Sequence, residues 1–189
     1  MKNKSILIGV ALIAAITISG CAANRVTAPL SSLTTRDDVF SEVSSSETEN
    51  SRAIADIKFS VKSISLRFFE IYSKHSDPPL RVYLNIDGQT TILDSDPVLE
   101  DNSSKNHSIP ESGTGWRYQF NKRIALAPGK HKLTIAIPVD NMVVEREIEL
   151  HSGANTLTLI PVYKNESPRR PSKYQHFSAG VKTLDVMIN

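Results

Sequence analysis

The side chains in this sequence that could bind a metal form one loose group. The acidic residues Asp94, Asp96, Glu100 and Asp101 offer the oxygen ligands that Ca²⁺ prefers. Their spacing does not match an EF-hand loop, Pro97 interrupts them, and no glycine lies among them, so a solvated polar loop is the alternative. We therefore keep these four residues as a weak calcium site and expect no other metal centre.

Catalytic patterns are missing from the sequence. It has no Gly-x-Ser-x-Gly elbow, no Gly-rich phosphate loop and no dinucleotide fingerprint. We expect solvated turn histidines at His131, beside a Pro-Gly pair, and at His151, beside a Gly loop. No two histidines stand at metal-ligand spacing among His75, His107, His131, His151 and His176. The sequence thus favours a protein that is not an enzyme and carries no cofactor.

Two groups of side chains could contact a ligand or partner. Trp116 and Tyr118 share one face of an expected strand with Phe120, where core packing is the favoured interpretation and stacking on a sugar or a partner is the alternative. Arg169 and Arg170 near the C-terminus could contact anionic headgroups or an acidic partner, with a solvated tail as the alternative.

The N-terminal segment has the pattern of an export signal. Lys2 and Lys4 precede an apolar run from Ile6 to Ile18, followed by small residues and Cys21. The run is shorter than the 17–25 residues that usually span a bilayer, and a buried core helix is the alternative. Because Cys21 is the only cysteine, no intrachain disulfide can form.

The tetrapeptide Ile18-Ser19-Gly20-Cys21 resembles the lipobox of bacterial lipoproteins. The resemblance implies that a thioether-linked diacylglycerol is added to Cys21, that a signal peptidase cleaves before it, and that acyl chains hold the mature protein on a membrane. Ala22, where an Asp would favour inner-membrane retention, points to the outer membrane if the source is Gram-negative. Localisation in the cell envelope is therefore expected.

The rest of the chain is rich in alternating strand patterns. Leu80, Val82, Leu84 and Ile86 alternate with polar residues before the hairpin signal Asp87-Gly88, and similar patterns recur up to residue 162. Seven or eight such strands predict an all-β fold, a single antiparallel, Ig-like β-sandwich behind the cleaved signal peptide and a flexible tether. The segment 56–72 fits either a strand with a bulge near Lys62-Ser63 or a helix, and strand is favoured.

These patterns divide the chain into four parts. The Ser/Thr-rich segment after the cysteine has no sustained apolar period and reads as a tether that spans about 30–35 Å. The expected order is a signal peptide at 1–20, the lipidated cysteine and tether at 21–55, the sandwich at 56–163 with a loop insertion at 94–115, and a basic tail at 164–189 with a possible edge strand at Leu184, Val186 and Ile188.

Part of the sandwich also resembles the PEGA-type domains of bacterial envelope proteins. The similarity rests on Pro78–Gly88, on Ile124–Ile135 with its Pro-Gly turn and His131, and on Val144–Leu150, within about 78–163. It departs at 94–115, where such modules have a short connection. The resemblance implies a small β-sandwich with a binding or structural role and no catalytic residues.

Charge and composition limit the function further. Hydrophobic residues make up 40% of the 189 residues, which is ordinary for a globular protein. A formal net charge of +2 gives no support for nucleic-acid binding. We expect a lipid-anchored envelope protein that docks a protein partner at the membrane as a scaffold or accessory subunit. The alternative is a module that binds carbohydrate or an envelope polymer.

Overall fold

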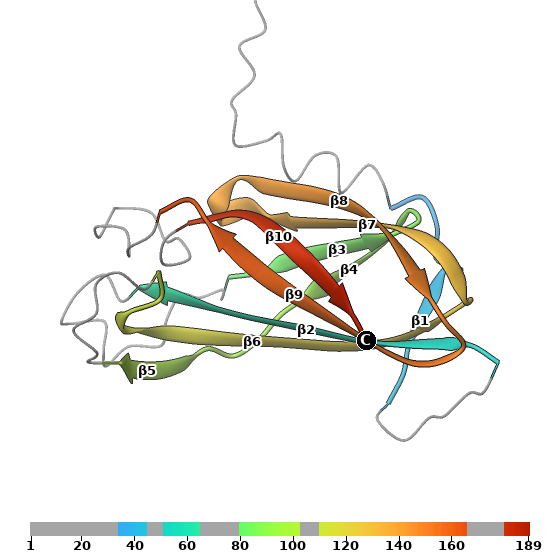
Figure 1. The fold of residues 1–189 in the computed structure, drawn as a ribbon, viewed down its shortest axis with the longest axis horizontal. Coiled ribbons are helices and arrows are strands. Elements are labelled where there is room, and N and C mark those ends of the chain that lie inside the picture. The colour runs from blue at the N-terminus through green and yellow to red at the C-terminus, as the bar shows by residue number, and fades with distance from the viewer. Residues whose placement is uncertain (1–33, 45–50, 65–79, 103–109, 166–179) are drawn as a thin grey trace, which may run out of the picture.

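The computed structural model describes residues 34–44, 51–64, 80–102, 110–165 and 180–189. These residues form strands and a single 3₁₀ turn, Pro138–Asp140 (Figure 1). The strands are β1 (Phe40–Glu42), β2 (Ala53–Ile64), β3 (Val82–Ile86), β4 (Gln89–Leu93), β5 (Val98–Asn102), β6 (Gly113–Leu126), β7 (Gly129–Ile137), β8 (Met142–Leu150), β9 (Gly153–Tyr163) and β10 (Val181–Ile188).

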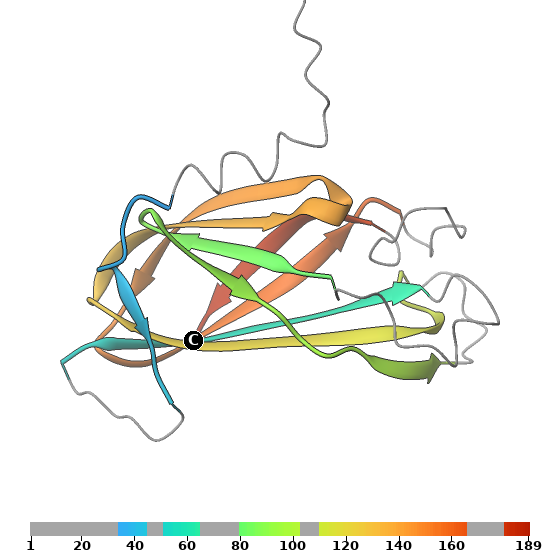
Figure 2. The same cartoon turned by 180° about the vertical axis from the view of Figure 1, so that it is seen from behind.

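The strands form two sheets packed face to face, which confirms the all-β sandwich. Sheet A has the order β1-β6-β2-β9-β10, and β5 pairs with the other end of the long strand β6. Sheet B has the order β4-β3-β7-β8. Figures 1 and 2 show the two layers, with β9 and β10 running from the lower layer toward β8. The expectation of wholly antiparallel pairing is wrong at one place, because β2 and β9 run parallel.

The alternating apolar residues meet between the sheets. Val82, Leu84 and Ile86 of β3 are fully buried, as expected from their period of two. On the facing sheet, the ring of Phe120 stacks on those of Phe59 and Tyr118, with 5.6 Å between centroids in each pair. Burying each aliphatic or Phe side chain of this layer contributes about 1.5–3 kcal/mol to stability.

The Asp87-Gly88 turn joins β3 to β4 as predicted. Both residues have positive φ, 48° and 97°, as a type I′ hairpin requires. The Asp87 carboxylate accepts hydrogen bonds from the Lys132 backbone N–H and pairs with His131 Nδ1, both at 2.7 Å. The His131 side chain is only 9% exposed, so the expectation of a solvated histidine is wrong there. His151 is exposed, as expected.

The boundaries of the sandwich lie outside those expected. Phe40 in β1 is 7% exposed, and β2 starts at Ala53, so the tether does not extend to residue 55. Periodicity could not reveal β1, because it has only three residues. The Gln89 side chain fixes β1 in place by accepting from the N–H groups of Val39 and Phe40, at 2.7 and 2.9 Å.

Two further segments join the sandwich. The predicted insertion at 94–115 contains β5 and the start of β6, so it is not loop throughout. The predicted edge strand in the tail is confirmed as β10, but it belongs to sheet A, with Val181 and Leu184 fully buried. The domain therefore extends beyond residue 163.

Strand β2 settles part of the ambiguity at 56–72. Its pairing with β6 is unbroken from Ala53 to Ile64, so the helix alternative and the bulge near Lys62-Ser63 are both wrong there. The alternation of buried and exposed residues along β2 breaks here, because Lys62 is buried together with its neighbours Val61 and Ser63. Residues 65–72 lie outside the described residues.

Candidate functional site

The aromatic residues predicted on one face of β6 belong mainly to the core. Tyr118 is fully buried, and its hydroxyl accepts a hydrogen bond from the Leu80 N–H at 3.2 Å. The contact role considered for Tyr118 is therefore wrong. Trp116 is half-buried and packs against the same core. Its ring does not form an open stacking platform.

Among the described side chains, the acidic residues of the candidate calcium site do not come together. Asp94 and Asp96 are exposed, whereas the Glu100 carboxylate is engaged by Arg117 Nε at 2.7 Å and by Lys62 Nζ at 3.4 Å. Asp101 lies in β5, where it is the pairing partner of Thr114 in β6. Among the described residues, no group of three or more His, Asp or Glu side chains could hold a metal ion. The physical reason is that cationic side chains already occupy the Glu100 oxygens.

The other predicted site residues lie outside the described part of the chain. These are the lipobox residues Ile18, Ser19, Gly20 and Cys21, together with Arg169 and Arg170. Within the described ranges, no helix is long and apolar enough to cross a membrane.

A charged cluster that the sequence did not reveal lies at one end of sheet A. We call it the Arg117 cluster, and it consists of Lys62, Glu100, Glu111, Arg117 and Tyr163. Arg117 bridges both carboxylates, because its guanidinium pairs with Glu100 and with Glu111. Glu111 also accepts from the Tyr163 hydroxyl and, at 3.1 Å, from the Lys62 backbone N–H. The Lys62 ammonium, 1% exposed, donates to the Gly113 carbonyl as well as to Glu100.

The surroundings of the Arg117 cluster shift the pKa values of Glu100 and Tyr163. Hydrogen bonds from Arg117 lower the pKa of Glu100, so this carboxylate stays ionised and paired. Burial and the adjacent Glu111 carboxylate raise the pKa of Tyr163, so its hydroxyl keeps its proton. A general base or a nucleophile would need a free lone pair in a cleft, whereas each of these groups is bonded to another. The cluster ties β2, β5, β6 and β9 together.

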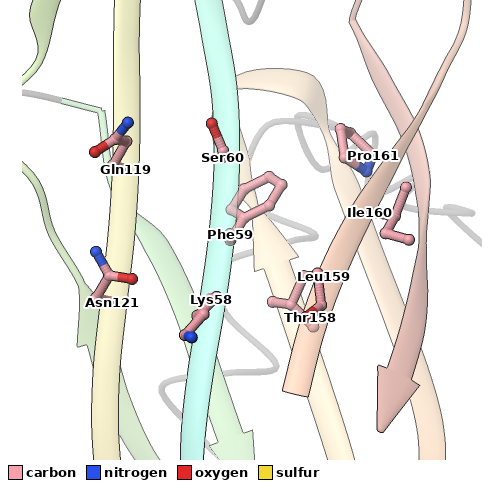
Figure 3. A pocket seen from close by; sticks show the side chains of 9 residues that line it. All are labelled: Lys58, Phe59, Ser60, Gln119, Asn121, Thr158, Leu159, Ile160 and Pro161. Atoms are coloured by element: carbon pink, nitrogen blue, oxygen red, sulfur yellow. The ribbon is translucent and has the colours of Figure 1, made fainter. Parts of the chain in front are cut away.

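A second feature is a shallow hollow of about 280 Å³ on the outer side of sheet A (Figure 3). It is open to solvent and crosses β6, β2 and β9, where alternate side chains of each strand point away from the core. Met187 of β10 adjoins it, opposite Thr158. We call this surface the sheet A face and define it by Lys58, Ser60, Gln119, Asn121, Thr158, Ile160 and Met187.

Lys58 lies at the centre of the sheet A face. Asn121 of β6 and Thr158 of β9 are its cross-strand partners, and its side chain is exposed. In Figure 3 it lies between the amides of β6 and the β9 side chains. Its neighbour Asp56 is paired with Arg123 at 3.5 Å. Within the part of the chain that the structure describes, no carboxylate pairs with Lys58.

Exposed apolar side chains gather where β9 and β10 lie together. Ile160, Met187 and Ile188 are 38%, 50% and 36% exposed. Ile160 faces Asp185 and Thr158 faces Met187 in the β9–β10 register, so Ile160 and Met187 are diagonal neighbours on one face. The sheet A face therefore combines a cation, amides and hydroxyls with a small apolar patch.

Strand β10 also presents an unpaired edge among the described strands. Thr156 and Asn189 exchange two backbone hydrogen bonds, of 2.8 and 3.1 Å. In an antiparallel pair such bonds recur at every second residue, so Met187 and Asp185 of β10 are the next residues bonded to β9. The backbone groups of Leu184, Val186 and Ile188 then point outward. Arg146 of β8 donates to the Leu184 carbonyl at 3.3 Å and covers only that end.

Searches against protein-family models, curated proteins and solved structures found no match to this chain.

Proposed function

We propose that this protein is a lipid-anchored docking subunit of the bacterial cell envelope, and that it binds a protein partner through the sheet A face and the adjoining edge of β10. The lipobox-like sequence before Cys21 supports the anchor, because two or more acyl chains are enough for stable membrane attachment. The outer membrane is the proposed location if the source is Gram-negative, since Ala22 follows the cysteine.

The observation that carries the proposed docking role is the position of the apolar patch. Single exposed apolar residues are common on protein surfaces, whereas adjacent ones beside an open strand edge favour a contact with another chain. Ile160 and Met187 lie on the sheet A face, and the outward backbone groups of Val186 and Ile188 lie at its margin. An extended segment of a partner that pairs with that edge would bring the rest of the partner over the patch.

A non-enzymatic role is consistent with the charged groups of the described residues. The titratable side chains of the Arg117 cluster are paired with one another, and Lys122 and His131 are likewise paired with carboxylates. A carbohydrate-binding role is the weaker proposal, because Tyr118 is buried and Trp116 packs on the core.

Site-specific photo-crosslinking in living cells tests the docking proposal. A photoreactive amino acid at Met187 is expected to give a discrete adduct with a partner protein. The matched control is Val143 of sheet B, which is 44% exposed and apolar but lies away from the sheet A face. Absence of an adduct at position 187, or equal adducts at both positions, would overturn the proposal.

A further inference from the structure

We propose that the sheet A face binds an acidic, extended segment of the partner, with a carboxylate on Lys58 and an apolar side chain on Ile160. This inference rests on the proposed docking function and specifies the chemistry of the partner segment. It is carried by the charge at Lys58 and by the arrangement of the residues around it.

Lys58 differs in its charge pairing from the other cations of β2 and β6. Lys62 and Arg117 are paired within the Arg117 cluster, Lys122 is paired with Glu42 at 2.6 Å, and Arg123 with Asp56. Lys58 differs from all four, because in the described residues its ammonium has no acidic partner, although the strands around it are well ordered by pairing. A carboxylate from another chain would complement it.

The neighbours of Lys58 suit such a carboxylate. The Asn121 and Gln119 amides and the Ser60 and Thr158 hydroxyls can donate hydrogen bonds to its oxygens or to a peptide backbone. Phe59 is the aromatic residue lining the hollow, and it is 2% exposed because it belongs to the core. A sugar would therefore find no ring to stack on, which favours a peptide.

The spacing of the face fits an extended peptide. Thr158 is the partner of Lys58 in the β2–β9 pairing, and Ile160 lies two residues further along β9. Strand and residue spacings place the Cα atoms of Lys58 and Ile160 about 8 Å apart. Residues i and i+2 of an extended segment lie on one side and about 7 Å apart. An acidic residue followed two positions later by an apolar one would reach both.

An acid on the same face sets the orientation of the segment. Asp185 is the partner of Ile160 in the β9–β10 register and is exposed. It would repel a carboxylate placed at the β10 side. The acidic residue of the partner is thereby directed to Lys58 and the apolar one to Ile160 and Met187.

Two peptides test the inference by fluorescence anisotropy on the full chain in detergent micelles. The probes are Thr-Glu-Thr-Leu-Thr-Thr and Thr-Gln-Thr-Leu-Thr-Thr, acetylated and carrying the same neutral fluorophore. We expect the Gln peptide to bind about fivefold more weakly, which corresponds to ~1 kcal/mol. Lys58→Gln should abolish this difference. The matched control Lys130→Gln changes an exposed strand lysine of sheet B and should preserve it.

Several outcomes would overturn the inference. These are equal binding of the two peptides, no binding of either, or a preference for Glu that persists in a Lys58→Gln variant with unchanged thermal midpoint. Tighter, Lys58-dependent binding of oligogalacturonate than of the Glu peptide would assign the face to an anionic glycan instead. If the adduct at Met187 forms while the Glu peptide shows no preference, docking stands and only the acidic segment is wrong.

Discussion

Arg117 bridges the two carboxylates of the Arg117 cluster. It joins Glu100 of β5 and Glu111 of the turn before β6, while Glu111 also accepts from Tyr163 of β9. Loss of the guanidinium would leave two carboxylates short of a counter-charge in a region that is only 20% to 34% exposed. Such a loss lowers the free energy of unfolding, because a partly desolvated carboxylate without a counter-charge is no longer compensated for its lost hydration.

Replacing Arg117 by Met should therefore lower the free energy of unfolding by about 2–3 kcal/mol, somewhat below the loss for a fully buried pair. Lys122→Met is the matched control, because its partner Glu42 is 58% exposed, and it should cost about 1 kcal/mol or less. Urea unfolding of both variants gives the comparison. Equal losses would mean that the Arg117 cluster contributes no more than a surface pair.

Acid should weaken the protein through Glu100. Arg117 lowers the pKa of Glu100 in the folded state, so the unfolded chain binds more protons as the pH falls through about 4.3 and below. The stabilisation is present above that pH and is lost at lower pH. Glu100→Gln removes this group and should reduce the slope of unfolding free energy against pH between 5 and 3, by at most about 1.4 kcal/mol per pH unit.

Urea titrations at stepped pH values measure that slope. Asp96→Asn is the control, since Asp96 is exposed, and its slope should match the wild-type slope. Identical slopes in all three proteins would show that Glu100 is not held in its charged form by Arg117.

At the scale of single elements, the β2–β6 pair depends on a glycine. A Cβ at Gly115 would lie 2.1 Å from the Ser63 carbonyl oxygen of the neighbouring strand. Gly115→Ala should therefore separate the strand ends and cost about 1–3 kcal/mol. The neighbouring Trp116 is the only tryptophan, so its emission should shift to the red.

Gly129→Ala is the comparison for Gly115→Ala. Gly129 has a positive φ of 131°, unlike Gly115, and nothing lies within 4 Å of a Cβ there. That variant should lose stability through backbone strain alone and keep the wild-type emission. An unshifted Trp116 spectrum in Gly115→Ala would contradict the close approach of the two strands.

The register of β10 makes a prediction about two prolines. The N–H of Val186 faces outward, whereas that of Asp185 faces β9 and pairs with Ile160. Val186→Pro should therefore preserve the ladder, and Asp185→Pro should cost about 1–3 kcal/mol more. Thermal or urea unfolding compares them. A larger loss for Val186→Pro would place the bonds in the opposite register.

Sequence reasoning predicted the elements with a clean period of two and failed where tertiary contacts override it. The β3–β4 hairpin was predictable because Asp87-Gly88 carries its own turn chemistry. The burial of Lys62 was not predictable, because it depends on contacts with Glu100 and Glu111, which lie far away in the sequence. The sheet A face was also not predictable from the sequence, since Lys58, Asn121 and Thr158 become neighbours only through strand pairing.

In the whole molecule, the proposed anchor and the proposed docking face lie on one chain. The proposed lipid on Cys21 would hold the sandwich at a membrane surface, and the sheet A face would meet a partner there. Cys21→Ser removes the thiol that the lipid needs, so the variant should leave the membrane fraction for the soluble one. Cell fractionation measures this, and unchanged partition with membranes would contradict the anchor.

Docking at the membrane requires both the proposed anchor and the proposed docking face, and one measurement tests the two together. Photo-crosslinking at Met187 is compared in cells that produce the wild-type chain or Cys21→Ser at equal levels. We expect a discrete adduct in the wild type and its loss in Cys21→Ser. No adduct in the wild type, or an equally strong adduct in Cys21→Ser, would contradict docking at the membrane.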